Sequence, residues 1–450
     1  MSLNYFGTDG IRGEYGGSVL NDALAYRAGR AAAVLAKSLY SVEVPTLLIG
    51  RDTRGSGVAL QKALTAGFAE EGGSVIHVGV APTPAIAYAS SHSSAHLACA
   101  LTASHNPFKD NGLKFFDTAG SKFNEEVEAR FDSLLDDFSA PTSITEVDGV
   151  REASSLIELY CGSLVERIGA GVLDGKRVAL DCANGATSAI AQGLFESLGA
   201  EVDVIGNQPD GSNINSGVGS ECPSAIKSLY DKASYDLGFA FDGDGDRVIA
   251  FDENGDKLSG EGVMAALAIW MNTQKRLTGS TLVTTLQSNL GLDAALSAFG
   301  ISVERTDIGD KHVSRRMVAG DFALGGEESG HLIIGEFAMT GDGICSALAL
   351  CQMVASTGKS LSSLVSVYDA FPQSSKAIKV AEKIPLADCV SLQSAMSDLD
   401  VELGTEGRML VRYSGTEPKL RLLVEAKSEE QVECAMEALL VAASADLEVL

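Results

Sequence analysis

The stretch Thr46-Leu47-Leu48-Ile49-Gly50 is an apolar run typical of a buried strand, and a loop rich in Gly and Arg follows it. A helical run continues from Val58 to Glu71, the pair Gly72-Gly73 ends it, and a second apolar run covers Val75 to Val78. Strand, helix, glycine stop and strand in this order are typical of a right-handed βαβ crossover between parallel strands. This stretch therefore predicts an α/β fold.

The same order of elements recurs twice further along the chain. The second copy has a strand from Arg177 to Asp181, a helix from Thr187 to Leu198, the stop at Gly199, and a strand from Glu201 to Ile205. The third copy has a strand from Thr281 to Thr285, a helix from Leu290 to Phe299, the stop at Gly300, and a strand from Ser302 to Asp307. Chance similarity is an alternative, because any α/β fold contains such pieces. We favour three related α/β domains.

The C-terminal part has a different pattern. Strands are expected at Met409 to Arg412 and at Leu420 to Glu425, beside a helix from Glu429 to Ala443, which together predict a small α+β domain. Polar or proline-containing stretches near residues 139–153, 252–256 and 371–372 mark the boundaries. The expected domains are therefore residues 1–150, 151–255, 256–370 and 371–450.

The charge balance limits the partners that this chain can have. Its 450 residues include 34 Lys and Arg against 60 Asp and Glu, a formal net charge of −26. This excludes general affinity for nucleic acid and disfavours an anionic membrane surface, because both depend on basic side chains. A small anionic substrate would need a local cationic patch within a repelling field.

The expected compartment is the cytoplasm. No apolar run approaches the ~20 residues of a membrane-spanning helix, and the first residues have neither a basic nor an apolar region typical of a signal peptide. The eight cysteines are scattered without a C-x-x-C pair, as expected for reduced, mostly buried thiols.

An acidic cluster, Asp242-Gly243-Asp244-Gly245-Asp246-Arg247, follows the apolar run from Leu237 to Phe241. The two glycines let the chain bend so that the three carboxylates converge, and oxygen ligands alone favour Mg²⁺ or Ca²⁺. An EF-hand is excluded, since Arg247 stands where that loop needs glycine and the flanking segments look like strands. A solvated acidic turn is the alternative to a metal site.

Two further loops are candidates for chemistry. Thr102-Ala103-Ser104-His105-Asn106-Pro107 follows an apolar run but lacks the glycines of a nucleophile elbow, and an ordinary turn is the alternative. The segment from Arg412 to Arg421 combines hydroxyls, a glycine and flanking arginines, which suits a phosphate dianion. A hairpin with solvated arginines is the alternative for that segment.

Seven motifs, taken together and in this order, resemble those of the α-D-phosphohexomutases, and within them those of the bacterial phosphoglucosamine mutases. They are Phe6-Gly7-Thr8-Asp9-Gly10-Ile11-Arg12-Gly13, Ser104-His105-Asn106-Pro107, Asn111-Gly112-Leu113-Lys114-Phe115-Phe116, Asp181-Cys182-Ala183-Asn184-Gly185-Ala186, Asp242 to Arg247, Gly326-Glu327-Glu328-Ser329-Gly330-His331, and Ser414-Gly415-Thr416-Glu417-Pro418. The resemblance implies four domains around a central cleft, three related mixed α/β units plus a smaller C-terminal α+β domain.

The resemblance also implies roles for individual residues. Ser104 matches the family's phosphoserine, and its phosphate would complete the ligand shell of one Mg²⁺ held by Asp242, Asp244 and Asp246. Cationic positions at the reaction centre are matched by Arg12, Lys114 and Arg247. The sugar-binding loop is matched by Glu327, Ser329 and His331, and the loop for the non-reacting phosphate by Arg412, Ser414, Gly415, Thr416 and Arg421. Lys114 and His331 are candidates for the general base.

The implied reaction interconverts glucosamine 6-phosphate and glucosamine 1-phosphate and so supplies the synthesis of UDP-N-acetylglucosamine and the cell wall. It would pass through a sugar 1,6-bisphosphate, which also serves as activator, and the enzyme would be a monomer or homodimer. One departure weakens the amino-sugar assignment, since Glu328 stands where phosphoglucosamine mutases more often have an amide.

Three alternatives to this activity stay open. The chain could be a phosphomannomutase or phosphoglucomutase of the same family, which would prefer a neutral sugar. It could be an aspartyl-phosphate phosphatase, because an apolar strand ending in Asp242-x-Asp244 resembles that arrangement, with Asp242 as nucleophile. It could also be a catalytically silent sugar-phosphate-binding protein.

Overall fold

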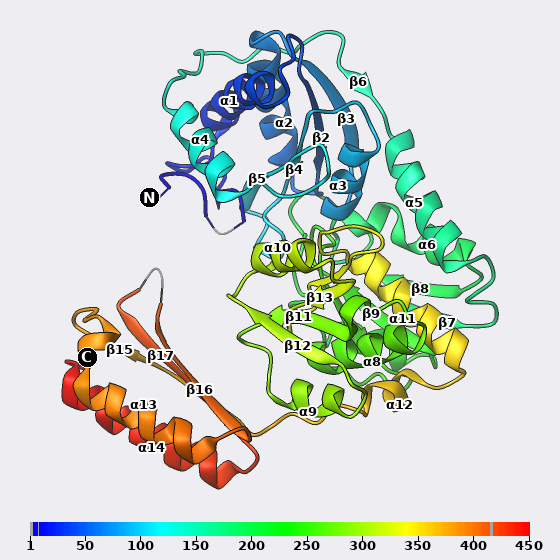
Figure 1. Ribbon diagram of the computed structural model, residues 1–450. Helices are drawn as coiled ribbons and strands as arrows, with labels where there is room; N and C mark the ends of the chain where they lie inside the picture. The colour runs from blue at the N-terminus through cyan, green and yellow to red at the C-terminus, as the bar shows by residue number, and fades with distance from the viewer. Residues whose placement is uncertain (1–2, 8, 415–416) are drawn as a thin grey trace. The chain divides into compact units, whose positions relative to one another are not determined.

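The computed structural model of the chain describes residues 3–7, 9–414 and 417–450 (Figure 1). These residues form two compact units, one comprising the described residues up to Gln287 together with Ile301–Ser366, and the other comprising Ser288–Gly300 and Val367–Leu450. The four domain boundaries expected from the sequence stay a prediction.

The first sheet of the larger unit has six strands in the order β1-β5-β4-β2-β3-β6. Alternate residues of the central strands, among them Leu47, Ile49 and Leu101, lie in one buried cluster with side chains of helices α1, α2 and α4. The strands are β1 (Ile11–Glu14), β2 (Thr46–Arg51), β3 (Ser74–Val80), β4 (Leu97–Leu101), β5 (Asp110–Phe116) and β6 (Arg151–Glu152), and the helices are α1 (Asp22–Tyr40), α2 (Gly57–Glu70), α3 (Thr83–Ser91) and α4 (Glu125–Leu135).

Two four-stranded sheets complete the larger unit, in the orders β10-β9-β7-β8 and β12-β11-β13-β14. Their strands are β7 (Arg177–Asp181), β8 (Glu201–Ile205), β9 (Leu237–Phe241), β10 (Val248–Phe251), β11 (Thr281–Thr285), β12 (Ser302–Thr306), β13 (Leu324–Gly326) and β14 (Leu332–Ile334). The helices of this part are α5 (Ser155–Ile168), α6 (Ala191–Ser197), α7 (Lys227–Tyr230), α8 (Gly260–Thr273), α10 (Asp310–Gly320), α11 (Gly343–Thr357) and α12 (Leu361–Val365), with short 3₁₀ turns at Ala186–Ala189 and Thr278–Ser280.

All three sheets share one topology. In each, a central strand pairs in parallel with the strand that follows it in sequence and with a third strand, and this third strand pairs antiparallel with a fourth. The matching sets are β5-β4-β2-β3, β10-β9-β7-β8 and β14-β13-β11-β12. Identical pairing in three places confirms the expected three related mixed α/β units.

The smaller unit is an antiparallel sheet in the order β15-β17-β16, and two helices share one buried core with it. Its elements are α9 (Gly291–Ser297), β15 (Gln373–Lys379), a 3₁₀ turn at Leu386–Asp388, α13 (Val390–Leu403), β16 (Gly407–Tyr413), β17 (Lys419–Ala426) and α14 (Glu429–Asp446). The α+β character expected for this end of the chain is confirmed.

The predicted helices differ from the observed ones mainly where local turns replace a helical start. The helix expected from Thr187 to Leu198 is a 3₁₀ turn followed by the shorter α6, and the helix expected from Leu290 to Phe299 is the seven-residue α9. Among the described residues, no helix combines the length and the apolar character needed to cross a membrane.

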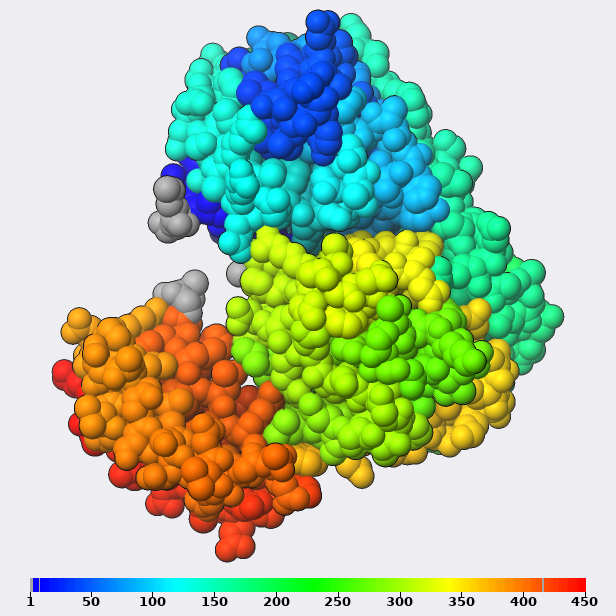
Figure 2. Space-filling model, in the orientation of Figure 1, coloured from blue at the N-terminus to red at the C-terminus, as the bar shows by residue number. Residues whose placement is uncertain are grey.

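On the face of the larger unit shown in Figure 2, the blue-to-cyan residues of the first sheet region meet the yellow-green residues around α10. Ion pairs accompany this contact, because Arg315 Nη1 donates to Glu125 Oε1 at 3.1 Å and Lys311 Nζ lies 3.9 Å from Glu128 Oε2. The first and third sheet regions are therefore joined by side chains of α4 and α10.

The helices α1 and α2 pack unusually closely because two glycines face each other. A methyl group on Gly67 would lie 1.9 Å from the carbonyl oxygen of Tyr26, and one on Gly29 would lie 2.2 Å from that of Leu64. Neither neighbour is a flexible side chain, so the helix backbones would have to separate to admit a larger residue.

We expect Gly67→Ala to lower the free energy of unfolding by about 2 kcal/mol or more, because overpacking forces backbone shifts. The matched control is Gly162→Ala in the middle of α5, where the added methyl meets nothing within 4 Å. That variant should gain up to about 1 kcal/mol from helix propensity. Urea unfolding followed by circular dichroism measures both, and an unchanged midpoint for Gly67→Ala contradicts the packing argument.

Candidate active site

The predicted site loops of the larger unit occupy the same position in each repeated sheet. In every case the third strand ends in the loop and the chain returns as a strand that pairs antiparallel with it. The serine loop (residues 102–107) follows β4, the metal loop (residues 242–247) follows β9, and the sugar loop (residues 326–331) begins at the last residue of β13. Carboxyl ends of parallel strands are common positions for ligand-binding loops.

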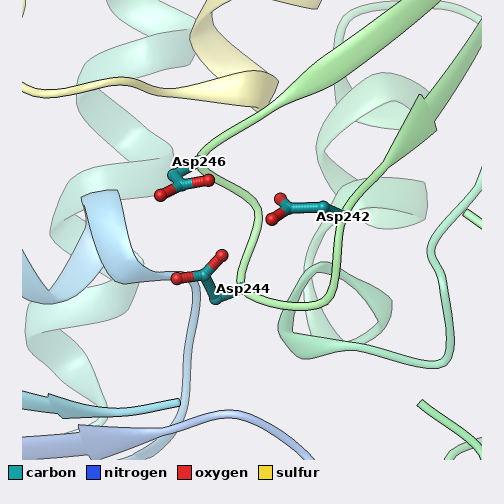
Figure 3. A group of neighbouring side chains, drawn as sticks. All are labelled: Asp242, Asp244 and Asp246. Carbon is teal, nitrogen blue, oxygen red and sulfur yellow. The ribbon is translucent and has the colours of Figure 1, made fainter. Parts of the chain in front are cut away.

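The three aspartates of the metal loop converge, as Figure 3 shows. Asp242, Asp244 and Asp246 are all buried, and one carboxylate oxygen from each lies within 4.8 Å of those from the other two. Burial, then the charges of Asp246 and Asp244, raise the pKa of Asp242 well above its usual range. Carboxylates this close repel one another unless a cation lies among them.

The residues present fit a hard divalent cation. Oδ1 of Asp244 and Oδ1 of Asp246 are buried and accept no hydrogen bond from the described residues. Buried oxygens without partners are rare, and an all-oxygen donor set is what Mg²⁺ prefers. Asp242, Asp244 and Asp246 therefore form a candidate magnesium site.

Ser104 lies beside this cluster, although it is 138 residues away in sequence from Asp242. Its hydroxyl donates a 2.6 Å hydrogen bond to Asp242 Oδ2, and its side chain is buried. Gly243 permits this approach, since a methyl group there would lie 2.6 Å from the carbonyl oxygen of Ser104. The serine loop and the metal loop thus share one site.

Lys114 of β5 brings a positive charge to the cluster. Its Nζ lies 2.8 Å from Asp244 Oδ2, 3.0 Å from Asp9 Oδ2 and 3.3 Å from Asp246 Oδ2. Burial lowers the pKa of Lys114, but these three carboxylates outweigh it and raise the pKa well above its usual value. These contacts favour the charged form of Lys114, and the identity of the general base stays a prediction.

The two arginines of the predicted reaction centre also lie near the carboxylates. The backbone N–H of Arg247 donates to Asp242 Oδ1 at 3.2 Å, and Arg12 pairs with Asp9. Burial lowers the pKa of Arg247, but Asp246, Asp242 and Asp244 raise it above its ordinary value. Buried Nε atoms of both arginines have no hydrogen-bond partner among the described residues, so each has a donor available for a ligand.

The sugar loop reaches the same cluster through His331. Its Nδ1 lies 3.9 Å from Asp246 Oδ2 and its Nε2 lies 3.4 Å from Asp310 Oδ2. Burial lowers the pKa of His331, but the two carboxylates outweigh it and raise the pKa. Glu327 Oε1 accepts from the backbone N–H of Gly309, whereas Ser329 Oγ is buried without a partner in the described part of the chain.

The phosphate loop (residues 412–421) belongs to the smaller unit. Arg412 and Arg421 are directly opposite each other on β16 and β17, and burial and then Arg421 lower the pKa of Arg412. Ser414 is buried, and its backbone N–H donates to the carbonyl of Lys419 at 2.8 Å. Gly415 and Thr416 lie outside the described residues.

Sequence reasoning missed three charged residues that extend the site. Lys122 Nζ donates to Asp9 Oδ1 at 2.6 Å and also pairs with Asp310, which in turn contacts His331. Asp9 lies inside a quoted motif but received no role, and Lys122 and Asp310 belong to no motif. Only the fold reveals that positive and negative side chains alternate from Asp246 through Lys114, Asp9 and Lys122 to Asp310.

Comparison with known proteins agrees with this arrangement. Four family models cover most of the chain: phosphoglucomutase/phosphomannomutase domain I at residues 3–137, domain II at 159–255, domain III at 259–371 and the C-terminal domain at 376–440. The chain belongs to the phosphoglucomutase/phosphomannomutase family, whose members are phosphohexomutases.

Individual relatives indicate a narrower class of protein than the family models do. A phosphoglucosamine mutase of Leuconostoc citreum is 40% identical over 98% of this chain and 97% of its own length. A phosphoglucosamine mutase of Halalkalibacterium halodurans is 42% identical over 95% of each chain. Among solved structures, a putative phosphomannomutase of Thermus thermophilus has a TM-score of 0.79 at 24% identity, covering 98% of this chain and 99% of its own.

A more distant structure was solved with ligands. The N-acetylphosphoglucosamine mutase of Aspergillus fumigatus, in complex with GlcNAc-6P and magnesium, has a TM-score of 0.66 at 18% identity and covers 99% of this chain and 96% of its own. At 18% identity this similarity shows a shared fold and nothing further.

We expect Asp244→Asn to weaken Mg²⁺ binding at least ten-fold, because it removes one charge from the ligand set. The control is Asp231→Asn, which makes the same change of charge at an exposed position. Isothermal titration of Mg²⁺ into the purified chain measures both affinities. Equal affinities for the two variants would contradict the metal assignment.

Proposed function

We propose that the chain interconverts glucosamine 6-phosphate and glucosamine 1-phosphate. The observation that carries this proposal is the 2.6 Å hydrogen bond between Ser104 Oγ and Asp242 Oδ2 inside a buried carboxylate cluster. Curated phosphoglucosamine mutases about 40% identical over nearly the full length support the choice of sugar.

In the proposed reaction Ser104 carries the phosphoryl group. A hydroxyl of the sugar phosphate attacks the phosphorus, the bond to Ser104 Oγ breaks, and the serine oxygen takes a proton while a 1,6-bisphosphate forms. The bisphosphate then presents its other phosphate, and the serine oxygen attacks that phosphorus. The bond from this phosphorus to the sugar oxygen breaks, the serine proton passes to that oxygen, and the isomeric monophosphate leaves. No phosphoryl group is gained or lost, so a sugar 1,6-bisphosphate is also the expected activator of an unphosphorylated chain.

The charged side chains lower the barrier by stabilising the transferring phosphoryl group. Mg²⁺ bound by Asp242, Asp244 and Asp246, with the serine phosphate as a further ligand, would supply Lewis-acid polarisation. Arg12, Lys114 and Arg247 provide positive charge around the same oxygens, as phosphoryl transfer generally requires. Lys114 is already desolvated, which strengthens its effect on a nearby anion.

The remaining predicted residues would bind the parts of the substrate that do not react. Arg412, Ser414 and Arg421, with Gly415 and Thr416, would hold the second phosphate, because paired arginines and hydroxyls suit a dianion. Glu327, Ser329 and His331 would contact the sugar. Glu328 belongs to the same loop and is half-buried, and burial raises the pKa of its carboxyl.

We expect Ser104→Ala to lose activity almost completely, because it removes the phosphoryl carrier. The control is Ser91→Ala, a serine exposed at the end of α3. Intact mass spectrometry of the chain without substitutions should show about 80 Da of added phosphate, and this added mass should be absent from Ser104→Ala. Retained activity in Ser104→Ala would instead favour an aspartyl phosphatase acting through Asp242, and a chain that never carries phosphate would favour a silent binding protein.

The choice of sugar is tested by competition among glucosamine, glucose and mannose phosphates. We expect kcat/KM to be highest for the glucosamine phosphates, at least ten-fold above either neutral sugar, which corresponds to about 1.4 kcal/mol of transition-state discrimination. A ten-fold preference for a neutral sugar would reassign the chain to phosphoglucomutase or phosphomannomutase activity.

A further inference from the structure

Arg54 is the largest fully buried side chain in the described part of the chain, and no motif singled it out. It lies between β2 and α2, and its guanidinium donates to four backbone carbonyls of the segment that follows β4. Nη2 reaches the carbonyls of Ser104 and Asn106 at 2.9 Å each, and Nη1 reaches those of Pro107 at 2.5 Å and Asp110 at 2.9 Å. One side chain therefore binds the backbone carbonyls of three residues of the serine loop, Ser104, Asn106 and Pro107, and that of Asp110 beyond it.

Asp52 fixes the orientation of that guanidinium. Its Oδ2 accepts from Arg54 Nε at 2.8 Å, and its Oδ1 accepts from the Arg54 backbone N–H at 2.9 Å. Thr102 Oγ1 donates to the same Asp52 carboxylate at 2.7 Å and accepts from the backbone N–H of Ser104 at 2.9 Å. Both backbone polar groups of Ser104 are thus tied to the Asp52–Arg54 pair.

Asn215 contacts the same carbonyls from the part of the chain that holds the metal loop. Its Nδ2 donates to the carbonyl of Ser104 at 2.9 Å and to that of Asn106 at 3.1 Å. The carbonyl oxygen of Ser104 therefore accepts from Arg54 and Asn215 together, which uses both of its lone pairs.

These contacts meet a specific need of Ser104. Its φ is +52°, the left-handed region that a non-glycine residue enters at a cost of roughly 1–2 kcal/mol. Such a conformation persists only where neighbouring groups fix it, and it occurs often at reactive residues. Here the groups that fix it are the fully buried guanidinium of Arg54 and the half-buried amide of Asn215.

We propose that Arg54 is a positioning residue for phosphoryl transfer, and that Asn215 shares this role. Together they hold Ser104 in the conformation that aims its Oγ at the metal loop. The inference rests on the proposed function, because it assigns to Arg54 an effect on the chemistry of Ser104. A lysine cannot substitute, since its three donors lie at one point whereas the planar guanidinium spans four carbonyls.

The first test is Arg54→Lys, which keeps the charge opposite Asp52. We expect kcat to fall at least ten-fold at a temperature where the variant is folded, while KM for the sugar phosphate changes less than about three-fold. The rate at which glucose 1,6-bisphosphate phosphorylates Ser104, followed by intact mass, should fall in parallel with kcat. A purely structural role would lower the melting temperature and leave both rates unchanged.

The matched control is Arg30→Lys. Arg30 Nε donates to Glu71 Oε1 at 2.8 Å, so this change perturbs a second arginine–carboxylate pair of the same sheet region, one that is partly buried rather than fully buried. Arg30→Lys should lower the melting temperature and leave kcat and the phosphorylation rate within two-fold of their values in the chain without substitutions.

If Arg54→Lys does not fold, Asn215→Gly provides the same readouts. Asn215 has a φ of +59°, which glycine adopts without strain, so the substitution removes the amide and keeps the backbone. We expect kcat and the phosphorylation rate to fall at least three-fold. If both rates are unchanged in the folded variants, the inference is overturned. If Ser104 is never phosphorylated in the chain without substitutions, the proposed function is overturned instead.

Discussion

The arrangement of this molecule depends on one contact, the approach of the Ser104 hydroxyl to the carboxylate of Asp242. Three buried aspartates on one short loop are costly, and burial makes their mutual repulsion stronger than it would be in water. The surrounding structure offsets this cost with Lys114, Arg247 and the serine hydroxyl. The same side chains that make the cluster tolerable are those suited to a transferring phosphoryl group, so the stability and the chemistry of the site have one electrostatic origin.

The repeated topology explains how such distant segments meet. In each mixed sheet the third strand ends in a loop and the chain returns through a strand antiparallel to it, and each repeat carries a different chemical group on that loop. The first carries the hydroxyl of Ser104, the second the carboxylates after β9, and the third the polar side chains after β13. One folding unit, used three times, therefore contributes three separate functions to the protein.

Much of this was predictable from the sequence. The apolar runs with glycine stops predict the parallel strands, and the spacing of Asp242, Asp244 and Asp246 by itself predicts an oxygen-lined metal site. Lys122, Asp310 and Arg54 were not predictable, because their roles depend on partners distant in the sequence and on no local pattern. The break at 186–190 was also missed, since the helical pattern does not reveal that a 3₁₀ turn opens the segment before α6.

The alternation of charge from Asp246 to Asp310 also limits which amino-acid substitutions the site can accept during evolution. Every inner member lies between neighbours of opposite sign, as Lys122 does between Asp9 and Asp310. Replacing one member by a neutral residue leaves an uncompensated ion in a medium of low polarity, which is far more costly than the loss of a surface pair. A substitution that keeps the protein functional must then be accompanied by a second substitution at the neighbouring charge. These residues should therefore change more slowly during evolution than the residues of the helices around them.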